Sequence, residues 1–318
     1  MKLVTIDSPP SGRIGALLAS GEILDIARAR HAGTIEAWMP LSVREVLCAG
    51  ASGMDAVRRV VDRAEQSSGV ERERLAEAGA FLPASTRLLA PIPDPGMIVS
   101  TGMAYRSHLA EMNTAAPKNP SGFIKVREAI TGPGAPIILP PQAADMVDFE
   151  GEFSCVIGAP CHNATPEEAM RCVAGYTIIN DVSARDWVEA AITPKEPQAA
   201  AAGWRLNHLG KQFPTFSPMG PVMLVREGEA PAPDLQLTTR LNGKVMQSAR
   251  TGDLIFSVGE TIAWFSRWYR FMPGDIVTTG SPDGVGYARN PKVFMKHGDV
   301  VEVEVEGIGV LSNPIRRA

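Results

Sequence analysis

Several features that mark membrane, secreted or nucleic-acid-binding proteins are missing from this 318-residue sequence. Its longest apolar runs, such as residues 222–225, are far too short to span a bilayer. The first residues contain neither the apolar segment nor the cleavage site of a secretory signal, which predicts a cytoplasmic protein. Lysine and arginine are scattered and the net charge is −4, so we expect no nucleic-acid partner and no membrane surface.

Cysteine is scarce too, and the four thiols include no Cys-x-x-Cys pair. We therefore expect reduced cysteines in or near the core. The content of hydrophobic residues, 45%, and of charged residues, 21%, is ordinary for a globular protein, and it excludes a disordered or fibrous chain.

The first third of the chain predicts a small α/β domain. Three short strands are expected over residues 2–7, 13–18 and 23–27. Ser42 and Glu45 form a capping box, and apolar residues at helical spacing follow, which predicts two short helices separated by residues 49–53. The proline-rich run 89–96 predicts a linker. We place the domains at residues 1–92 and 93–318.

The larger domain is predicted to be rich in strands, which makes the fold class α+β. Asn242-Gly243 is a strong type I′ turn signal and predicts a hairpin over residues 235–247. Capping boxes that begin at Thr165 and Ser257 predict two helices. Residues 191–203, rich in alanine and proline, predict an irregular loop, and residues 113–121 predict a polar loop that can close over a site.

The acidic run Asp148-Phe-Glu-Gly-Glu152 is the strongest chemical signal. In an extended strand Asp148, Glu150 and Glu152 share one face, while the other face is apolar. A solvated face is the commoner explanation of such spacing, and the acids at 302, 304 and 306 show the same period. Asp181 follows a second strand-like run, residues 175–180, at a position where functional loops often begin.

If these carboxylates lie close together, their negative charges must be neutralised. If Asp181 reaches Glu150 and Glu152, each pair of like charges costs roughly 4 kcal/mol at an effective dielectric of about 20. A divalent cation or a bound proton is then needed. Ligation by oxygen atoms alone favours Mg²⁺, Mn²⁺ or Ca²⁺ over zinc.

Other polar residues have two explanations each. His108 and Glu111, at positions i and i+3, can form a general base oriented by a carboxylate, or a surface histidine beside a surface acid. Arg185 can anchor a substrate carboxylate, or pair with Asp186 or another acid. Lys211 stands among turn residues that can hold it in place, or it is an ordinary surface lysine.

The glycine-rich loop over residues 279–286 follows a predicted strand. It lacks the lysine and the following helix of a phosphate-binding loop, so we exclude nucleotide binding there. Its backbone N–H groups and the Ser281 hydroxyl can still bind an anion.

With these residues identified, the chain from about residue 98 to 313 resembles the fumarylacetoacetate hydrolase family. The collinear matches are Tyr105-x-x-His108-x-x-Glu111, Phe123-x-Lys125, Gly132-Pro-Gly134, Asp148-Phe-Glu150-Gly-Glu152, Asn180-Asp181-Val-Ser-Ala-Arg185-Asp186, Lys211, Pro218-Met-Gly-Pro221, Asn242-Gly243, Pro273-Gly274-Asp275, Thr279-Gly280-Ser281-Pro282 and Gly307-Ile-Gly309. Each match is weak by itself, but so many in order are specific.

The resemblance implies a mixed β-sandwich roll, a homodimer, and Mg²⁺ or Mn²⁺ bound by Glu150, Glu152 and Asp181. It implies catalytic roles for His108, Glu111 and Lys211. It also implies a substrate site containing Tyr105, Lys125, Arg185, Gly280 and Ser281.

Two residues depart from the family pattern. Thr101 replaces an additional aspartate ligand of the vertebrate enzymes. This departure and the spacing of His108 and Glu111 make the chain more similar to the bacterial acylpyruvase and 2-hydroxyhepta-2,4-diene-1,7-dioate isomerase branch. Val188 replaces a glutamine that many members carry near the substrate.

The function implied is metal-dependent hydrolysis of a C–C bond in a β-diketo acid, such as an acylpyruvate, fumarylpyruvate or fumarylacetoacetate. His108, oriented by Glu111, would activate the water, and the cation would stabilise the enolate that is released. Isomerase, decarboxylase (including oxaloacetate decarboxylase) and hydratase reactions on 2-oxo or 2-hydroxydienoic diacids are alternatives. A non-catalytic protein that binds small acids is an alternative of a different class.

Overall fold

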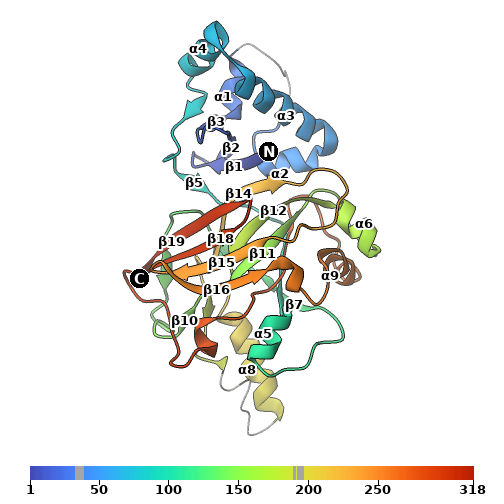
Figure 1. Cartoon of the computed structure of the whole chain (residues 1–318), viewed down its shortest axis with the longest axis vertical. Coiled ribbons are helices and arrows are strands. Elements are labelled where there is room, and N and C mark those ends of the chain that lie inside the picture. The colour runs from blue at the N-terminus through green and yellow to red at the C-terminus, as the bar shows by residue number, and fades with distance from the viewer. Residues whose placement is uncertain (33–38, 189–190, 192–196) are drawn as a thin grey trace.

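Two sheets and their helices make up the computed structural model, which describes residues 1–32, 39–188, 191 and 197–318 (Figure 1). The larger sheet has 12 strands, and the order along its main path is β4-β3-β2-β1-β14-β12-β11-β17-β6-β7. Its strands are β1 Lys2–Ile6, β2 Arg13–Leu17, β3 Ile23–Asp25, β4 Phe81–Leu82, β5 Leu88–Leu89, β6 Ile98–Gly102, β7 Ser121–Lys125, β8 Ile130–Thr131, β11 Gly151–Ile157, β12 Val173–Asn180, β14 Ser217–Val225 and β17 Ile276–Thr278.

The second sheet has five strands in the order β16-β15-β18-β19-β9. They are β9 Ile137–Leu139, β15 Gln236–Leu241, β16 Lys244–Arg250, β18 Val300–Val305 and β19 Gly309–Arg317. A short pair, β10 Val147–Asp148 with β13 Ser183–Ala184, stands apart from both sheets. Phe153 and Ile178 of the large sheet share a buried cluster with Leu237 and Val303 of the second sheet, so the two sheets form a sandwich. The predicted α+β, strand-rich class is confirmed.

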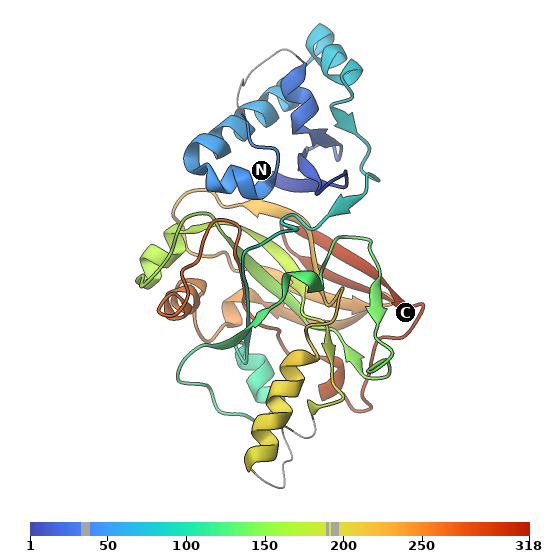
Figure 2. The same cartoon turned by 180° about the vertical axis from the view of Figure 1, so that it is seen from behind.

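Short helices cover the sheets and their edges (Figure 2). They are α1 Ile26–His31, α2 Val43–Cys48, α3 Gly50–Gln66, α4 Gly69–Glu77, α5 Arg106–Glu111, α6 Pro166–Arg171, α8 Pro197–Leu209 and α9 Val258–Phe265, with 3-10 turns at Arg127–Ala129, Thr251–Asp253 and Gly286–Ala288. The predicted capping boxes at Ser42, Thr165 and Ser257 are confirmed. Among the described residues, no helix is long and apolar enough to cross a membrane.

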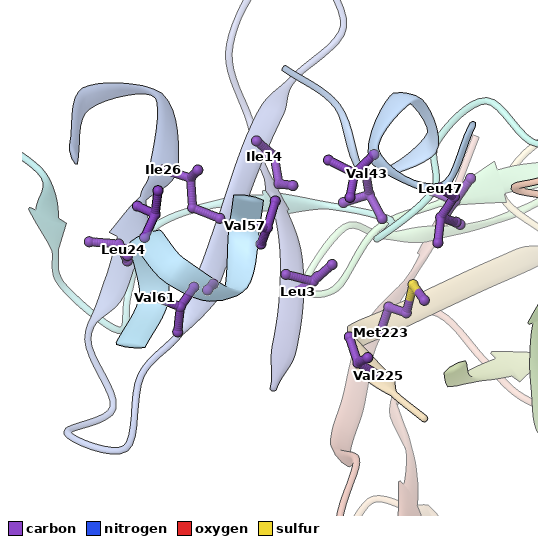
Figure 3. Close-up of a cluster of buried hydrophobic side chains, with 14 of the residues drawn as sticks. Leu3, Ile14, Leu24, Ile26, Val43, Leu47, Val57, Val61, Met223 and Val225 are labelled. Atoms are coloured by element: carbon purple, nitrogen blue, oxygen red, sulfur yellow. The ribbon is translucent and has the colours of Figure 1, made fainter. Parts of the chain in front are cut away.

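The N-terminal strands continue the large sheet. Strand β1 pairs with β14, and Leu3 faces Met223 in the register. Helices α2 and α3 pack on this part of the sheet through Val43, Leu47 and Val57 (Figure 3). The helices are separated by a single residue rather than by residues 49–53. Close packing explains this, because a Cβ atom at Gly53 would lie 2.6 Å from the carbonyl oxygen of Val46.

Two further expectations are corrected. The irregular loop predicted for residues 191–203 is wrong for residues 197–203, which belong to helix α8. The reason is the run Ala199–Ala202, because alanine has the highest helix propensity. Residues 189–190 and 192–196 lie outside the described residues. All four cysteines are free, but Cys48 is exposed. Cys48 is the last residue of α2 and does not lie on the helix face that buries Val43 and Leu47. The domain boundary at residues 92 and 93 stays a prediction.

The Leu3–Met223 contact offers a test of how the N-terminal strands are held. Leu3→Ala is expected to lower the free energy of unfolding by about 2–5 kcal/mol, because Leu3 is fully buried and the substitution leaves a cavity. Urea unfolding followed by circular dichroism measures this. Leu41→Ala is the matched control, since Leu41 is 52% exposed, and its effect should stay below about 0.5 kcal/mol. Equal losses in the two variants would contradict the packing described.

Candidate active site

Three carboxylates from neighbouring strands meet at one point. Glu152 lies on β11, Glu150 directly precedes that strand, and Asp181 directly follows β12. The two strands are antiparallel, and the Asp181 N–H donates to the Glu150 carbonyl at 2.8 Å. One carboxylate oxygen from each of the three side chains lies within 4.8 Å of the others. The sheet therefore brings together the three residues that the sequence singled out as metal ligands.

The three carboxylates differ in their environment. Burial opposes ionisation of Asp181, but Lys125 and Lys211 hold its pKa below the ordinary range. Burial likewise opposes ionisation of Glu150, but Lys211 and Arg185 lower its pKa. Burial raises the pKa of Glu152 well above its usual value, and the charges of Asp181 and Glu150 add to this effect. The buried Oε2 atom of Glu152 has no hydrogen-bond partner among the described residues.

Cationic side chains surround this cluster. The ammonium of Lys211 donates to Glu150 Oε2 at 2.6 Å and to Asp181 Oδ2 at 2.7 Å. Lys125, which is fully buried, pairs with Asp181 Oδ1 and donates to the Phe216 carbonyl at 3.0 Å. Lys125 precedes the clustered carboxylates in the sequence and Lys211 follows them, and both lysines pair with Asp181.

Of the two predicted roles of Arg185, the structure shows pairing with acids. These acids are Glu150 and Asp148 rather than Asp186. Arg185 pairs with Glu150 Oε1 and donates from Nε to Asp148 Oδ2 at 3.0 Å. The charges of Glu150 and then Asp148 outweigh the effect of burial and raise the pKa of Arg185. A contact between Arg185 and substrate stays a prediction.

Asp148 does not share a strand face with Glu150 and Glu152, which corrects the expectation of one continuous strand. The ladder breaks at residues 149 and 150, because the Phe149 N–H donates to the Asp148 side chain and the Glu150 N–H donates to Asn180 Oδ1. Asp148 is buried and accepts from the N–H groups of Gly286 and Tyr287 at 2.7 and 3.0 Å. The end of the glycine-rich loop thus binds an anion, and that anion is Asp148.

His108 and Glu111 are neighbours on α5, as their spacing predicts. Glu111 Oε2 lies 3.1 Å from His108 Nδ1, and the other oxygen accepts from the Gly284 N–H at 3.0 Å. The side chains of His108 and Glu111 are 13% and 23% exposed, so both are largely covered although Glu111 as a whole residue is exposed. Glu111 therefore orients the imidazole and ties α5 to the glycine-rich loop.

The remaining predicted residues line the same region. Tyr105, which precedes α5, is fully buried; burial raises its pKa, and the nearby charge of Glu152 adds to this. Ser281 Oγ accepts from Gln247 Nε2 at 2.7 Å, and Gln247 Oε1 accepts from the Gly151 N–H at 3.0 Å, next to Glu152. Gly280 has a φ of 78°, and a Cβ atom there would lie 3.2 Å from Ala104.

Two residues near the cluster, Ser100 and His208, gave no signal in the sequence. Ser100 on β6 donates to Asp181 Oδ2 at 3.1 Å. His208 on α8 stacks on Phe123, with ring centroids 4.7 Å apart, and burial and the charge of Lys211 lower its pKa. Helices α5 and α8 lie together at the end of the molecule away from the N-terminal strands (Figures 1 and 2). Recognising His208 would have required the prediction of α8.

Sequence comparison places most of the chain in one family. The model of the C-terminal domain of fumarylacetoacetate (FAA) hydrolase matches residues 97–316. The chain belongs to this family. Human mitochondrial oxaloacetate tautomerase FAHD2A is 38% identical over 256 residues, which cover 80% of this chain and 78% of the human protein. That relative is mitochondrial, so the cytoplasmic location stays a prediction.

Solved structures of the fumarylacetoacetate hydrolase family share the whole fold. The fumarylacetoacetate hydrolase of Exiguobacterium antarcticum is 29% identical, with a TM-score of 0.75 and full coverage of both chains. The 2-hydroxyhepta-2,4-diene-1,7-dioate isomerase of Mycobacterium marinum is 30% identical, with a TM-score of 0.67 over 100% of this chain and 98% of that chain. The family and the β-sandwich roll inferred from the sequence are confirmed.

The raised pKa of Glu152 leads to a prediction about cation binding. A proton held by Glu152 must leave before the carboxylate can bind a cation, so Mn²⁺ binding should release protons and grow stronger as the pH rises. Calorimetric titrations in two buffers of different ionisation enthalpy measure the proton release. Glu152→Gln should bind Mn²⁺ more weakly and release no proton. Heats that do not depend on the buffer in the unsubstituted protein would contradict this assignment.

Proposed function

We propose that the protein is a divalent-metal-dependent enzyme that interconverts the enol and keto forms of oxaloacetate or a similar 2-oxo diacid. The observation that carries this proposal is the cluster of Glu150, Glu152 and Asp181, in which one buried Glu152 oxygen finds no hydrogen-bond partner in the part of the chain that the structure describes. The name of the human relative supports the tautomerase reaction over the other reactions considered.

The residues present fit Mg²⁺ or Mn²⁺. All three donors are carboxylates, and hard divalent cations prefer oxygen ligands. A cation held by Glu150, Glu152 and Asp181 would polarise the 2-oxo group of the substrate and acidify the adjacent C–H bond. The carboxylate groups of the substrate would in turn be attracted by the positive charges of Lys211 and Arg185.

Proton transfer is the task of His108 in this proposal. Because Glu111 lies at Nδ1, the Nε2 atom of His108 is left to take a proton from the substrate carbon or return it to that carbon. Glu111 acts by positioning: its second oxygen is anchored at Gly284, so the imidazole is held against the glycine-rich loop. Tyr105 keeps its proton because burial raises its pKa, and it can serve as a donor toward the substrate.

Hydrolysis of a C–C bond in an acylpyruvate is the second candidate. The partial exposure of the His108 side chain, 13%, favours it, because water can reach the ring and lose a proton to it. The two reactions differ in their products: hydrolysis yields two acids, whereas tautomerisation leaves the carbon skeleton intact.

We expect His108→Asn to lower kcat/KM for oxaloacetate tautomerisation by about 100-fold or more, because a positioned acid–base group contributes about 10²–10⁴-fold. The assay is the ultraviolet absorbance of the enol form, with Mg²⁺ or Mn²⁺ present. A chelator should abolish the enzymatic rate. His297→Asn is the matched control, since His297 is exposed, and it should retain the wild-type rate.

Product analysis separates the candidates. With acylpyruvates as substrates, formation of pyruvate and a second acid at a higher kcat/KM than oxaloacetate tautomerisation would favour the hydrolase. A wild-type rate for His108→Asn in the presence of chelator, on both substrate classes, would overturn both candidates.

A further inference from the structure

Lys211 bridges two of the three clustered carboxylates. Its ammonium binds one oxygen of Glu150 and one of Asp181, at 2.6 and 2.7 Å. The second oxygen of each carboxylate is already committed, to Arg185 in Glu150 and to Lys125 in Asp181. All four carboxylate oxygens of Glu150 and Asp181 thus have a cationic partner, and a metal ion that bound both residues together with Glu152 would compete with these side chains.

The two lysines of the cluster are held differently. Lys125 is fully buried on β7, and its ammonium has a second partner in the backbone, the Phe216 carbonyl. Lys211 follows the C-terminus of α8, its side chain is 8% exposed, and within the described part of the chain its ammonium donates to the two carboxylates. Both partners of Lys211 are thus carboxylates of the cluster, whereas Lys125 also binds a backbone oxygen.

The Lys211 ammonium lies beside an aromatic ring. The Lys211 Nζ atom lies 5.8 Å from the centre of the Phe123 ring, whose face attracts cations. The ring is itself held by stacking against His208. The Lys211 N–H donates to the His208 carbonyl at 3.1 Å, which holds the Lys211 backbone at the end of α8.

We propose that Lys211 is an exchangeable counter-ion. In the metal-free protein its ammonium keeps Glu150 and Asp181 together; a divalent cation displaces it, and the released ammonium then meets the anionic substrate. The inference rests on the metal site of the proposed function. It assigns Lys211 a role that does not require substrate. The ammonium stabilises the Glu150 and Asp181 carboxylates until a divalent cation binds, and afterwards it stabilises the negative charge of the substrate.

The test compares Lys211→Met with the wild-type protein, using Mn²⁺ as the probe. Removal of the competing ammonium should tighten Mn²⁺ binding by about 10-fold or more, measured by calorimetry or by electron paramagnetic resonance of free Mn²⁺. The melting temperature in chelator should fall, because Glu150 and Asp181 lose their shared cation. The rise in melting temperature on adding Mn²⁺ should exceed that of the wild type.

Three further variants sharpen the test. Lys244→Met removes an exposed lysine of a distant hairpin and should change neither quantity. Lys211→Arg keeps the charge and should not tighten Mn²⁺ binding. Lys211→Gln removes the charge but keeps a donor, so it replaces the Met variant if that variant does not fold, and tighter Mn²⁺ binding is again expected.

The outcomes separate the inference from the proposed function. If the uncharged variant binds Mn²⁺ as the wild type does, or more weakly, the exchange is wrong while the metal site stands. If the wild-type protein itself binds no Mn²⁺, the metal site and the exchange are both wrong.

Discussion

The structure depends on the compensation of like charges that the antiparallel pairing of β11 and β12 forces together. Asp148, Glu150, Glu152 and Asp181 are all buried or nearly so, and isolated carboxylates are costly to bury. The cations that offset them come from three separate segments: Lys125, Arg185 and Lys211. Every element that contributes one of these charges is thereby fixed relative to the central strands, so the site and the fold are stabilised by the same ion pairs.

The same compensation organises the loops. Asp148 holds the end of the glycine-rich loop through the N–H groups of Gly286 and Tyr287, and Glu111 holds the middle of that loop through Gly284. His108 is thus attached to a loop whose far end is anchored to a carboxylate beside the cluster. These hydrogen bonds orient the imidazole, and acid–base catalysis requires a positioned ring nitrogen. The N-terminal strands extend the large sheet on its opposite side and contribute none of these charges.

Family membership constrains the chemistry more than it identifies the reaction. Hydrolases and isomerases of the fumarylacetoacetate hydrolase family share this fold, and the human relative is named a tautomerase. A cluster of carboxylates beside a positioned histidine suits any reaction in which negative charge develops next to a 2-oxo acid. The tautomerase is the simplest of these reactions, since it needs only a proton transfer, whereas the hydrolase also needs a correctly placed water.

Local patterns in the sequence determined the features that depend on near neighbours: the capping boxes, the Asn242-Gly243 hairpin, and the pairing of His108 with Glu111 on one helical turn. Collinear motifs were sufficient for the family and for the three clustered carboxylates. Only the tertiary structure decided the partners of Asp148 and Arg185, the burial of Lys125 and the position of Lys211 between two acids. These depend on contacts between segments far apart in the chain, and the sequence on either side of a buried charge does not specify which opposite charge it will meet.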